Sequence, residues 1–196
     1  TTISQSGSFS IAGAVSGGSN LTWSGPSSIE FSGVVTTTGT IHIQAGSLYG
    51  FGITGSVNSL GTGTIKLASG ATFGMAGTNV TFTNNVELLG AASVISGNLG
   101  GTRTLSGVIS ETGGARNLTL SGGSSIDTRF IVSGNNTYSG TTTITGDSQP
   151  LNERGAVIAG SNTAFGSGAI TLSQNGKIGV ANGITVANNI ALGGTG

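Results

Sequence analysis

Residues 20–30 read NLTWSGPSSIE, and roughly 100 residues later the chain reads NLTLSGGSSID at 117–127. A second pair of similar segments lies downstream, with LGTGTIKL at 60–67 and FGSGAITL at 165–172. Repetition at a fixed scale marks a stacked architecture, in which each unit buries its apolar face against its neighbours. The repeats therefore favour a scaffold, a fibre or an adhesin over a compact enzyme with one cleft.

The repeats also align in register. Residues 79–88 read NVTFTNNVEL and residues 183–192 read GITVANNIAL, so the apolar positions are kept while the positions between them drift. The paired asparagines Asn84, Asn85, Asn188 and Asn189 hold their places. Asparagine tolerates left-handed backbone geometry, and its amide can bond to the strands above and below it. We expect these four residues to form structural corners.

Short alternating segments predict an all-β fold. Each places two apolar side chains on one face, as in LTW at 21–23, IHI at 41–43 and IKL at 65–67. The segments are bounded by Gly, Asn and Ser, which suit turns. No window keeps the apolar spacing of a helix without an interruption by Gly or a Ser/Thr cluster.

Two all-β architectures fit this pattern, a sandwich or barrel of antiparallel strands and a β-solenoid. A sandwich prefers longer strands joined by hairpins, whereas short strands with a long repeat favour the solenoid. At ~20 residues per turn we expect about nine to ten turns. Residues 1–98 and 99–196 would form two repeats of one continuous solenoid, cut from a longer array because the end of the chain resembles the connection between the copies.

Composition limits the classes of partner. The chain has 196 residues with six basic and six acidic side chains, so it has no net charge to attract nucleic acid. No run approaches the ~20 apolar residues of a membrane helix, and we expect no membrane insertion of this segment. The absence of cysteine excludes disulfides, thiolate metal sites and cysteine catalysis.

The residue types that carry chemistry are few and scattered. The sequence has a single histidine, His42, and we expect it on the outer face because Ile41 and Ile43 flank it. We predict no catalytic residue, no metal site and no cofactor. A polysaccharide-degrading enzyme is the third-ranked alternative; it would need grouped acids, and Glu87 and Asp127 are the candidates.

The most polar stretch reads DSQPLNERG at 147–155. We expect a loop here that projects from one face of the solenoid. Five of its side chains form the candidate partner-binding loop: Asp147, Gln149, Asn152, Glu153 and Arg154. Its partner would be a surface glycan or a host protein.

Residues 133–146 read SGNNTYSGTTTITG, after the strand segment NLTLSG at 117–122 and before AFGSGAITL at 164–172. This arrangement resembles the autotransporter-associated β-strand repeat, also called the passenger-associated transport repeat. The likeness covers residues 117–172 well and the first copy weakly, where VVT at 34–36 replaces the NTY segment.

The resemblance implies a right-handed parallel β-helix on the outer surface of a Gram-negative bacterium. Members of this family are chiefly adhesins and long repetitive surface proteins. From the sequence we therefore expect a structural or adhesive stalk or filament segment that associates end to end or within a longer array. A glycan-binding or host-protein-binding adhesin module acting through the 147–155 loop is the alternative.

Overall fold

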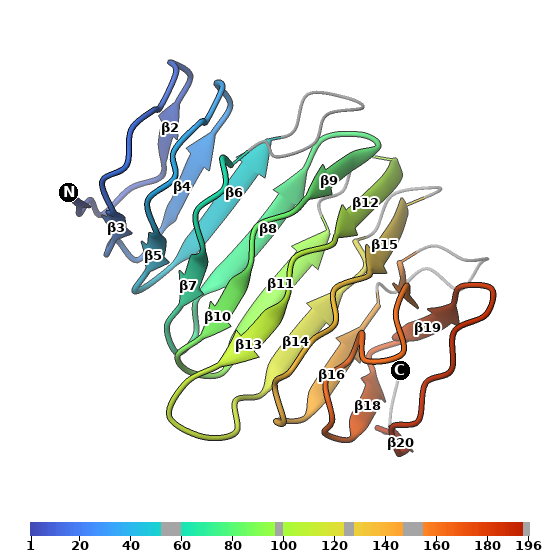
Figure 1. Ribbon diagram of the computed structural model, residues 1–196. Coiled ribbons are helices and arrows are strands. Elements are labelled where there is room, and N and C mark those ends of the chain that lie inside the picture. Colours follow the sequence, from blue (N-terminus) through green and yellow to red (C-terminus); the bar gives the residue numbers. More distant parts are fainter. Residues whose placement is uncertain (52–59, 97–99, 124–127, 147–154, 194–196) are drawn as a thin grey trace.

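The short alternating segments form the strands of three stacked parallel sheets. The computed structural model describes residues 1–51, 60–96, 100–123, 128–146 and 155–193, and these residues contain 20 strands and no helix. The strands lie side by side from the N-terminal to the C-terminal end of the molecule (Figure 1). The chain is a β-solenoid, as the sequence predicted.

Each turn contributes strands to up to three sheets. The six-stranded sheet contains β1 (Thr2–Ile3), β3 (Leu21–Trp23), β5 (Ile41–Ile43), β7 (Ile65–Leu67), β10 (Val86–Leu88) and β13 (Ile109–Glu111). The nine-stranded sheet contains β2 (Phe9–Ile11), β4 (Ser28–Phe31), β6 (Ser47–Phe51), β8 (Thr72–Ala76), β11 (Ala92–Ser96), β14 (Leu118–Ser121), β16 (Thr142–Thr145), β18 (Ile170–Ser173) and β20 (Ile190–Leu192). The five-stranded sheet contains β9 (Val80–Phe82), β12 (Gly101–Leu105), β15 (Thr128–Val132), β17 (Ala156–Ala159) and β19 (Lys177–Val180).

The register between turns places like residues on like residues. Ile41 pairs with Ile65, and Ile65 pairs with Val86. Their side chains form an apolar row that faces the interior and continues from turn to turn. The residues between them, such as His42, form outward rows. Because side chains alternate between the two faces of a strand, a shift by one residue would turn the whole apolar row outward. The alternation in the sequence therefore fixes the register.

One apolar core runs through the solenoid. Trp23, Ile43 and Leu67 occupy the same inward row of the six-stranded sheet and are fully buried. Phe73 and Phe82 meet edge to face inside the core, with ring centroids 5.6 Å apart. Buried apolar residues from all three sheets belong to this single cluster.

The number of turns was predicted wrongly. The strands make about 7 turns, not nine to ten; the nine strands of the longest sheet include strands of turns that the described residues do not complete. The prediction assumed ~20 residues per turn, but paired residues on successive turns can lie further apart in the sequence, as Thr142 and Ile170 do. The sheets also differ in length, since isolated bridges from Val35 to Val15 and to Leu60 occupy the place that the five-stranded sheet takes in later turns.

Glycine permits the close stacking of corners. A Cβ atom at Gly63 would overlap the carbonyl oxygen of Gly39 one turn away, and a Cβ at Gly168 would overlap that of Gly140. Gly63 and Gly168 belong to the two repeated segments at 60–67 and 165–172. The repeated Gly-x-Gly pattern is thus a packing requirement of the corner.

We predict that Gly63→Ala destabilises the chain by about 1–3 kcal/mol, because the added methyl group forces two turns apart. The midpoint of urea unfolding measures the change. Gly13→Ala is the matched control, since a Cβ at Gly13 has no atom within 4 Å. Equal midpoints for the two variants would contradict the role assigned to the corner.

Candidate functional site

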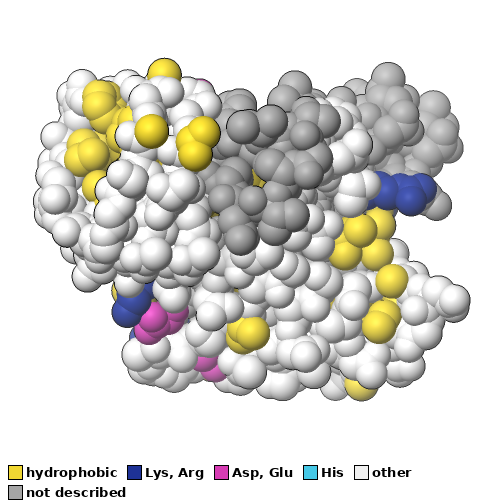
Figure 2. All heavy atoms as spheres, turned by 45° about the horizontal axis from the view of Figure 1, so that its top comes forward, with side chains coloured by type: hydrophobic (Ala, Val, Ile, Leu, Met, Phe, Trp, Pro, Cys, Tyr) yellow, Lys and Arg dark blue, Asp and Glu magenta, His cyan; other side chains and the backbone are white. Residues whose placement is uncertain are grey.

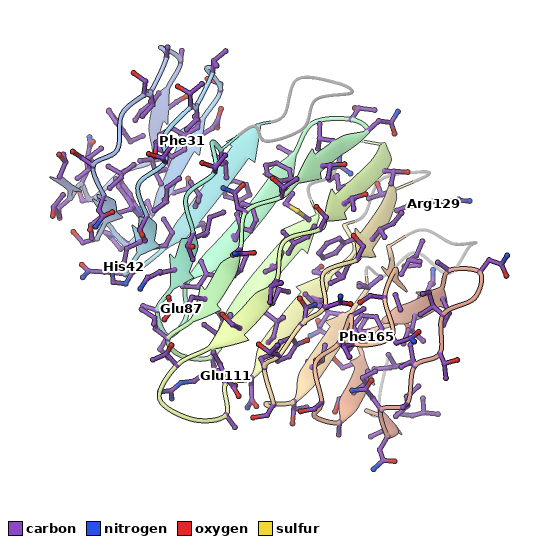
Figure 3. All side chains as sticks on the ribbon, in the orientation of Figure 1. Phe31, His42, Glu87, Glu111, Arg129 and Phe165 are labelled. Atoms are coloured by element: carbon purple, nitrogen blue, oxygen red, sulfur yellow. The ribbon has the colours of Figure 1, made fainter. Side chains whose placement is uncertain are left out.

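Three titratable side chains form an outward row on the six-stranded sheet. His42 pairs with Lys66 on the next turn, and Lys66 pairs with Glu87 on the turn after it. Figure 3 shows His42, Glu87 and Glu111 along one edge of the solenoid, with Arg129 on the opposite side. Strand register alone brings these groups together, since they lie far apart in the sequence.

Glu87 is held by two partners. Lys66 Nζ lies 2.9 Å from Glu87 Oε2, and Thr112 Oγ1 donates a hydrogen bond of 2.6 Å to Glu87 Oε1. The hydrogen bond from Thr112 and then that from Lys66 lower the pKa of Glu87 below its ordinary value. Because the ion pair is partly exposed, it contributes at most about 1 kcal/mol to stability. Its effect is to link three successive turns.

Glu111 holds the corner that follows β13. Its carboxylate accepts hydrogen bonds from the Arg116 backbone N–H at 2.6 Å, the Ser139 backbone N–H at 2.9 Å and the Ser139 hydroxyl at 2.6 Å. Burial alone would raise the pKa of Glu111, but these hydrogen bonds and one from Gly140 outweigh it and lower the pKa. The residue therefore joins its own loop to the next turn.

His42 is more covered than an exposed rim residue would be. It faces outward as predicted, but its Nε2 atom is buried and has no hydrogen-bond partner among the described residues. Burial and then the charge of Lys66 lower the pKa of His42. The imidazole is therefore neutral near pH 7.

The described carboxylates of the six-stranded sheet, Glu87 and Glu111, do not have the properties of a general acid. Such an acid needs a raised pKa and a second carboxylate across the reacting bond. Glu87 and Glu111 both have lowered pKa values and are both occupied by hydrogen bonds. Asp127, the other candidate acid, lies outside the described residues. The chemistry available on this sheet is electrostatic linkage between turns.

Asn84 occupies a corner inside the solenoid. Its side-chain amide is buried and donates to the carbonyl oxygens of Gly63 at 2.8 Å, Gly61 at 3.2 Å and Leu60 at 3.4 Å. These acceptors belong to the preceding turn, in the segment that carries the repeated Gly-x-Gly pattern. One side chain thus satisfies several carbonyl groups of a corner at once.

Asn188 lies at the equivalent corner. Its amide donates to the carbonyl oxygens of Gly168 at 2.7 Å and Gly166 at 3.1 Å. The following asparagines are equivalent too, since the Asn85 carbonyl accepts from the Ile65 N–H and the Asn189 carbonyl accepts from the Ile170 N–H, each at 2.8 Å. None of the four has a positive φ. Their side-chain and carbonyl bonds, and not left-handed backbone geometry, explain why asparagine stands there.

Exposed asparagine side chains accept hydrogen bonds from the next turn, whereas Asn84 and Asn188 donate them to the preceding turn. The side-chain oxygens of the exposed residues accept backbone N–H groups of the next turn, as Asn20 does from Thr40 at 2.9 Å and Asn117 from Thr141 at 3.0 Å. Asn20 and Asn117 open the two copies of the segment that repeats at 20–30 and 117–127. Asparagine therefore extends the hydrogen-bond ladder around corners where the strand has ended.

Asp147, Gln149, Asn152, Glu153 and Arg154 of the candidate loop lie outside the described residues. The described residue that follows them, Gly155, is buried and forms an antiparallel bridge with Gly122. The partner-binding role of this loop stays a prediction.

Sequence reasoning missed Arg103. This side chain is fully buried on β12, where its neighbours in register are Val80 and Phe130. Burial lowers its pKa. The signal was present in the alternation of residues 103–105, which gives Arg103 the same inward direction as Leu105.

The described residues contain no group of three or more His, Cys, Asp or Glu side chains that could hold a metal ion. Nor do they form a helix with the length and hydropathy needed to cross a membrane. Comparison with protein-family models, curated proteins and solved structures gave no match. The likeness to the autotransporter-associated repeat therefore stays a prediction from the residues.

We predict that Asn84→Ala lowers the free energy of unfolding by about 1–3 kcal/mol, because it leaves buried carbonyl groups without donors. Asn188→Ala should cost less, since that side chain is only partly buried. The exposed Asn182 provides a matched control as Asn182→Ala. Urea unfolding measures all three variants, and an order with Asn182→Ala as the most damaging would refute the assignment.

We also predict that stability falls as the pH drops below about 4.5, the ordinary pKa of a glutamate. Glu87 and Glu111 have lower pKa values in the folded chain, so they stabilise it above that pH and cease to do so when they are protonated. Glu111→Gln should flatten the dependence of the urea midpoint on pH between 6 and 3. Glu30→Gln, on another sheet, serves as the control; an unchanged slope in Glu111→Gln would be evidence against the linkage.

Proposed function

We propose that this chain is a structural segment of a bacterial surface protein, a β-solenoid stalk or filament that carries adhesive function. The observation that supports this proposal most is the single core running beneath three parallel sheets. Such a body resists bending because hydrogen-bond ladders in up to three sheets join each described turn to the next. Repetition of such turns makes the body longer and does not create a cleft.

The surface supports the same proposal. Only 6% of the residues are charged, and Figure 2 shows the Lys, Arg, Asp and Glu side chains of one face confined to small areas. The described charges on the six-stranded sheet link turns to each other. A body of this composition suits an anchored or assembled protein better than a free monomer that depends on charge for solubility. The proposal that the chain is displayed on the outer surface of a bacterium rests on the resemblance to the autotransporter-associated repeat.

Association along the solenoid axis is part of the proposal. The outermost strands of the nine-stranded sheet, β2 and β20, each pair with one neighbour in the described part of the chain. Phe9, Ile190 and Leu192 on these strands belong to inward rows and are exposed. A further turn, from a longer chain or from a second copy, would cover them and add to the ladder.

Electron microscopy of two and four copies joined in tandem tests the stalk. Nine strands at ~4.8 Å spacing span roughly 40 Å, so each copy should lengthen a straight rod by about that amount. Separate beads with no fixed increment would contradict the proposal. Release of reducing sugar from common polysaccharides by the single copy would favour the enzyme instead.

A further inference from the structure

The outer face of the nine-stranded sheet carries a row of hydroxyl groups along the solenoid. Strand register places one Ser or Thr above another through β4, β6, β8, β14, β16 and β18, with β11 in register between β8 and β14. The outward side chains of this row are Ser28, Ser47, Thr72, Thr119, Thr143 and Thr171. Each is partly exposed, and the turn-to-turn spacing is ~4.8 Å.

A second outward row lies two residues further along each strand. On β14, β16 and β18 it also consists of hydroxyl side chains, Ser121, Thr145 and Ser173. Among the described outward positions of this sheet, Glu30 is the one charged residue. This face therefore differs from that of the six-stranded sheet, where His42, Lys66 and Glu87 stand in line.

Tyr49 interrupts the second row with an aromatic ring. It pairs with Glu30 on one side and Gly74 on the other. A Cβ atom at Gly74 would overlap Cδ1 and Cε1 of Tyr49 and would lie 3.2 Å from its Cγ. The ring therefore lies across Gly74, in space that any other residue would fill. Tyr49 is partly exposed, and it lies on the same outward face as Ser47 and Thr72.

We propose that this face binds a neutral, extended polysaccharide chain lying along the solenoid axis, with Tyr49 as the stacking platform. Sugar rings present C–H groups that pack on the faces of aromatic rings, and their hydroxyl groups both donate and accept hydrogen bonds. Serine and threonine hydroxyl groups can donate hydrogen bonds to sugar hydroxyl groups and accept hydrogen bonds from them, and they carry no charge. A ligand that repeats along its length matches a surface that repeats at every turn.

The composition of the face distinguishes this ligand from two others. A polyanion such as nucleic acid would need Lys or Arg, and the described outward positions have none. A second copy of the chain would bury this face in a protein interface, whose centre is normally rich in aromatic and apolar side chains. Tyr49 is the one described aromatic side chain on the outer face of this sheet.

Titration of the isolated chain with hexamers of β-1,4-linked glucose and of β-1,4-linked N-acetylglucosamine tests the proposal. At least one hexamer should bind, as followed by calorimetry. Tyr49→Ala should weaken binding about tenfold through loss of the stacked ring. Tyr49→Phe should retain binding. Circular dichroism checks that each variant is folded.

Gly74→Ala supplies a second test that keeps the tyrosine. The backbone at Gly74 does not have a positive φ, so alanine is tolerated there, and its methyl group displaces only the Tyr49 ring. This variant should weaken binding as Tyr49→Ala does. Gly13→Ala, which introduces a methyl group with no neighbour within 4 Å, should not.

Three results would overturn the proposal. They are the failure of both hexamers to bind, unchanged affinity in Gly74→Ala, and sedimentation showing that the chain self-associates through Tyr49. The inference deepens the adhesive part of the proposed function, yet its failure is distinguishable. Rods of the expected length without glycan binding would leave the stalk in place and remove only the ligand.

Discussion

Every feature of this molecule depends on the hydrogen bonds that join each turn to the next at the spacing of a β-sheet. Within the strands the backbone makes these bonds itself. At the corners the chain changes direction, and the backbone groups there need other partners. Glycine lets the corners approach, as at Gly63 over Gly39, and asparagine amides supply donors and acceptors, as at Asn84 and Asn20. Because each turn is placed by the turn before it, the apolar rows, the charged row and the hydroxyl rows all inherit their alignment from these bonds.

The repeated segments were enough to predict the fold class and the inward direction of the apolar residues. Alternation fixes direction on a strand, and repetition fixes the stacking, so the sequence alone places Trp23 and Ile43 in a core. The number of turns could not be obtained in the same way. It depends on how many residues each turn contains, and the turn from Thr142 to Ile170 takes 28 residues against the ~20 assumed. Arg103 was not singled out from the sequence, although it has the same inward direction on β12 as Leu105.

Contacts between turns were the least predictable part of the candidate site. Glu111 and Ser139 are 28 residues apart in the sequence, and only the register of neighbouring turns brings them together. The same holds for Lys66 with Glu87 and for Tyr49 with Gly74. The described chemistry is therefore distributed along the axis instead of being concentrated in a cleft. This distribution agrees with a protein that works through its length and its surface.

Distances between spin labels test the stacked register most directly. The chain has no native cysteine, so label pairs can be introduced without background. Ser28→Cys with Thr119→Cys spans four strand spacings of the nine-stranded sheet, and Ser28→Cys with Thr171→Cys spans six. At ~4.8 Å per spacing the account predicts separations of roughly 20 Å and roughly 30 Å. Equal separations, or a shorter distance for the second pair, would contradict it.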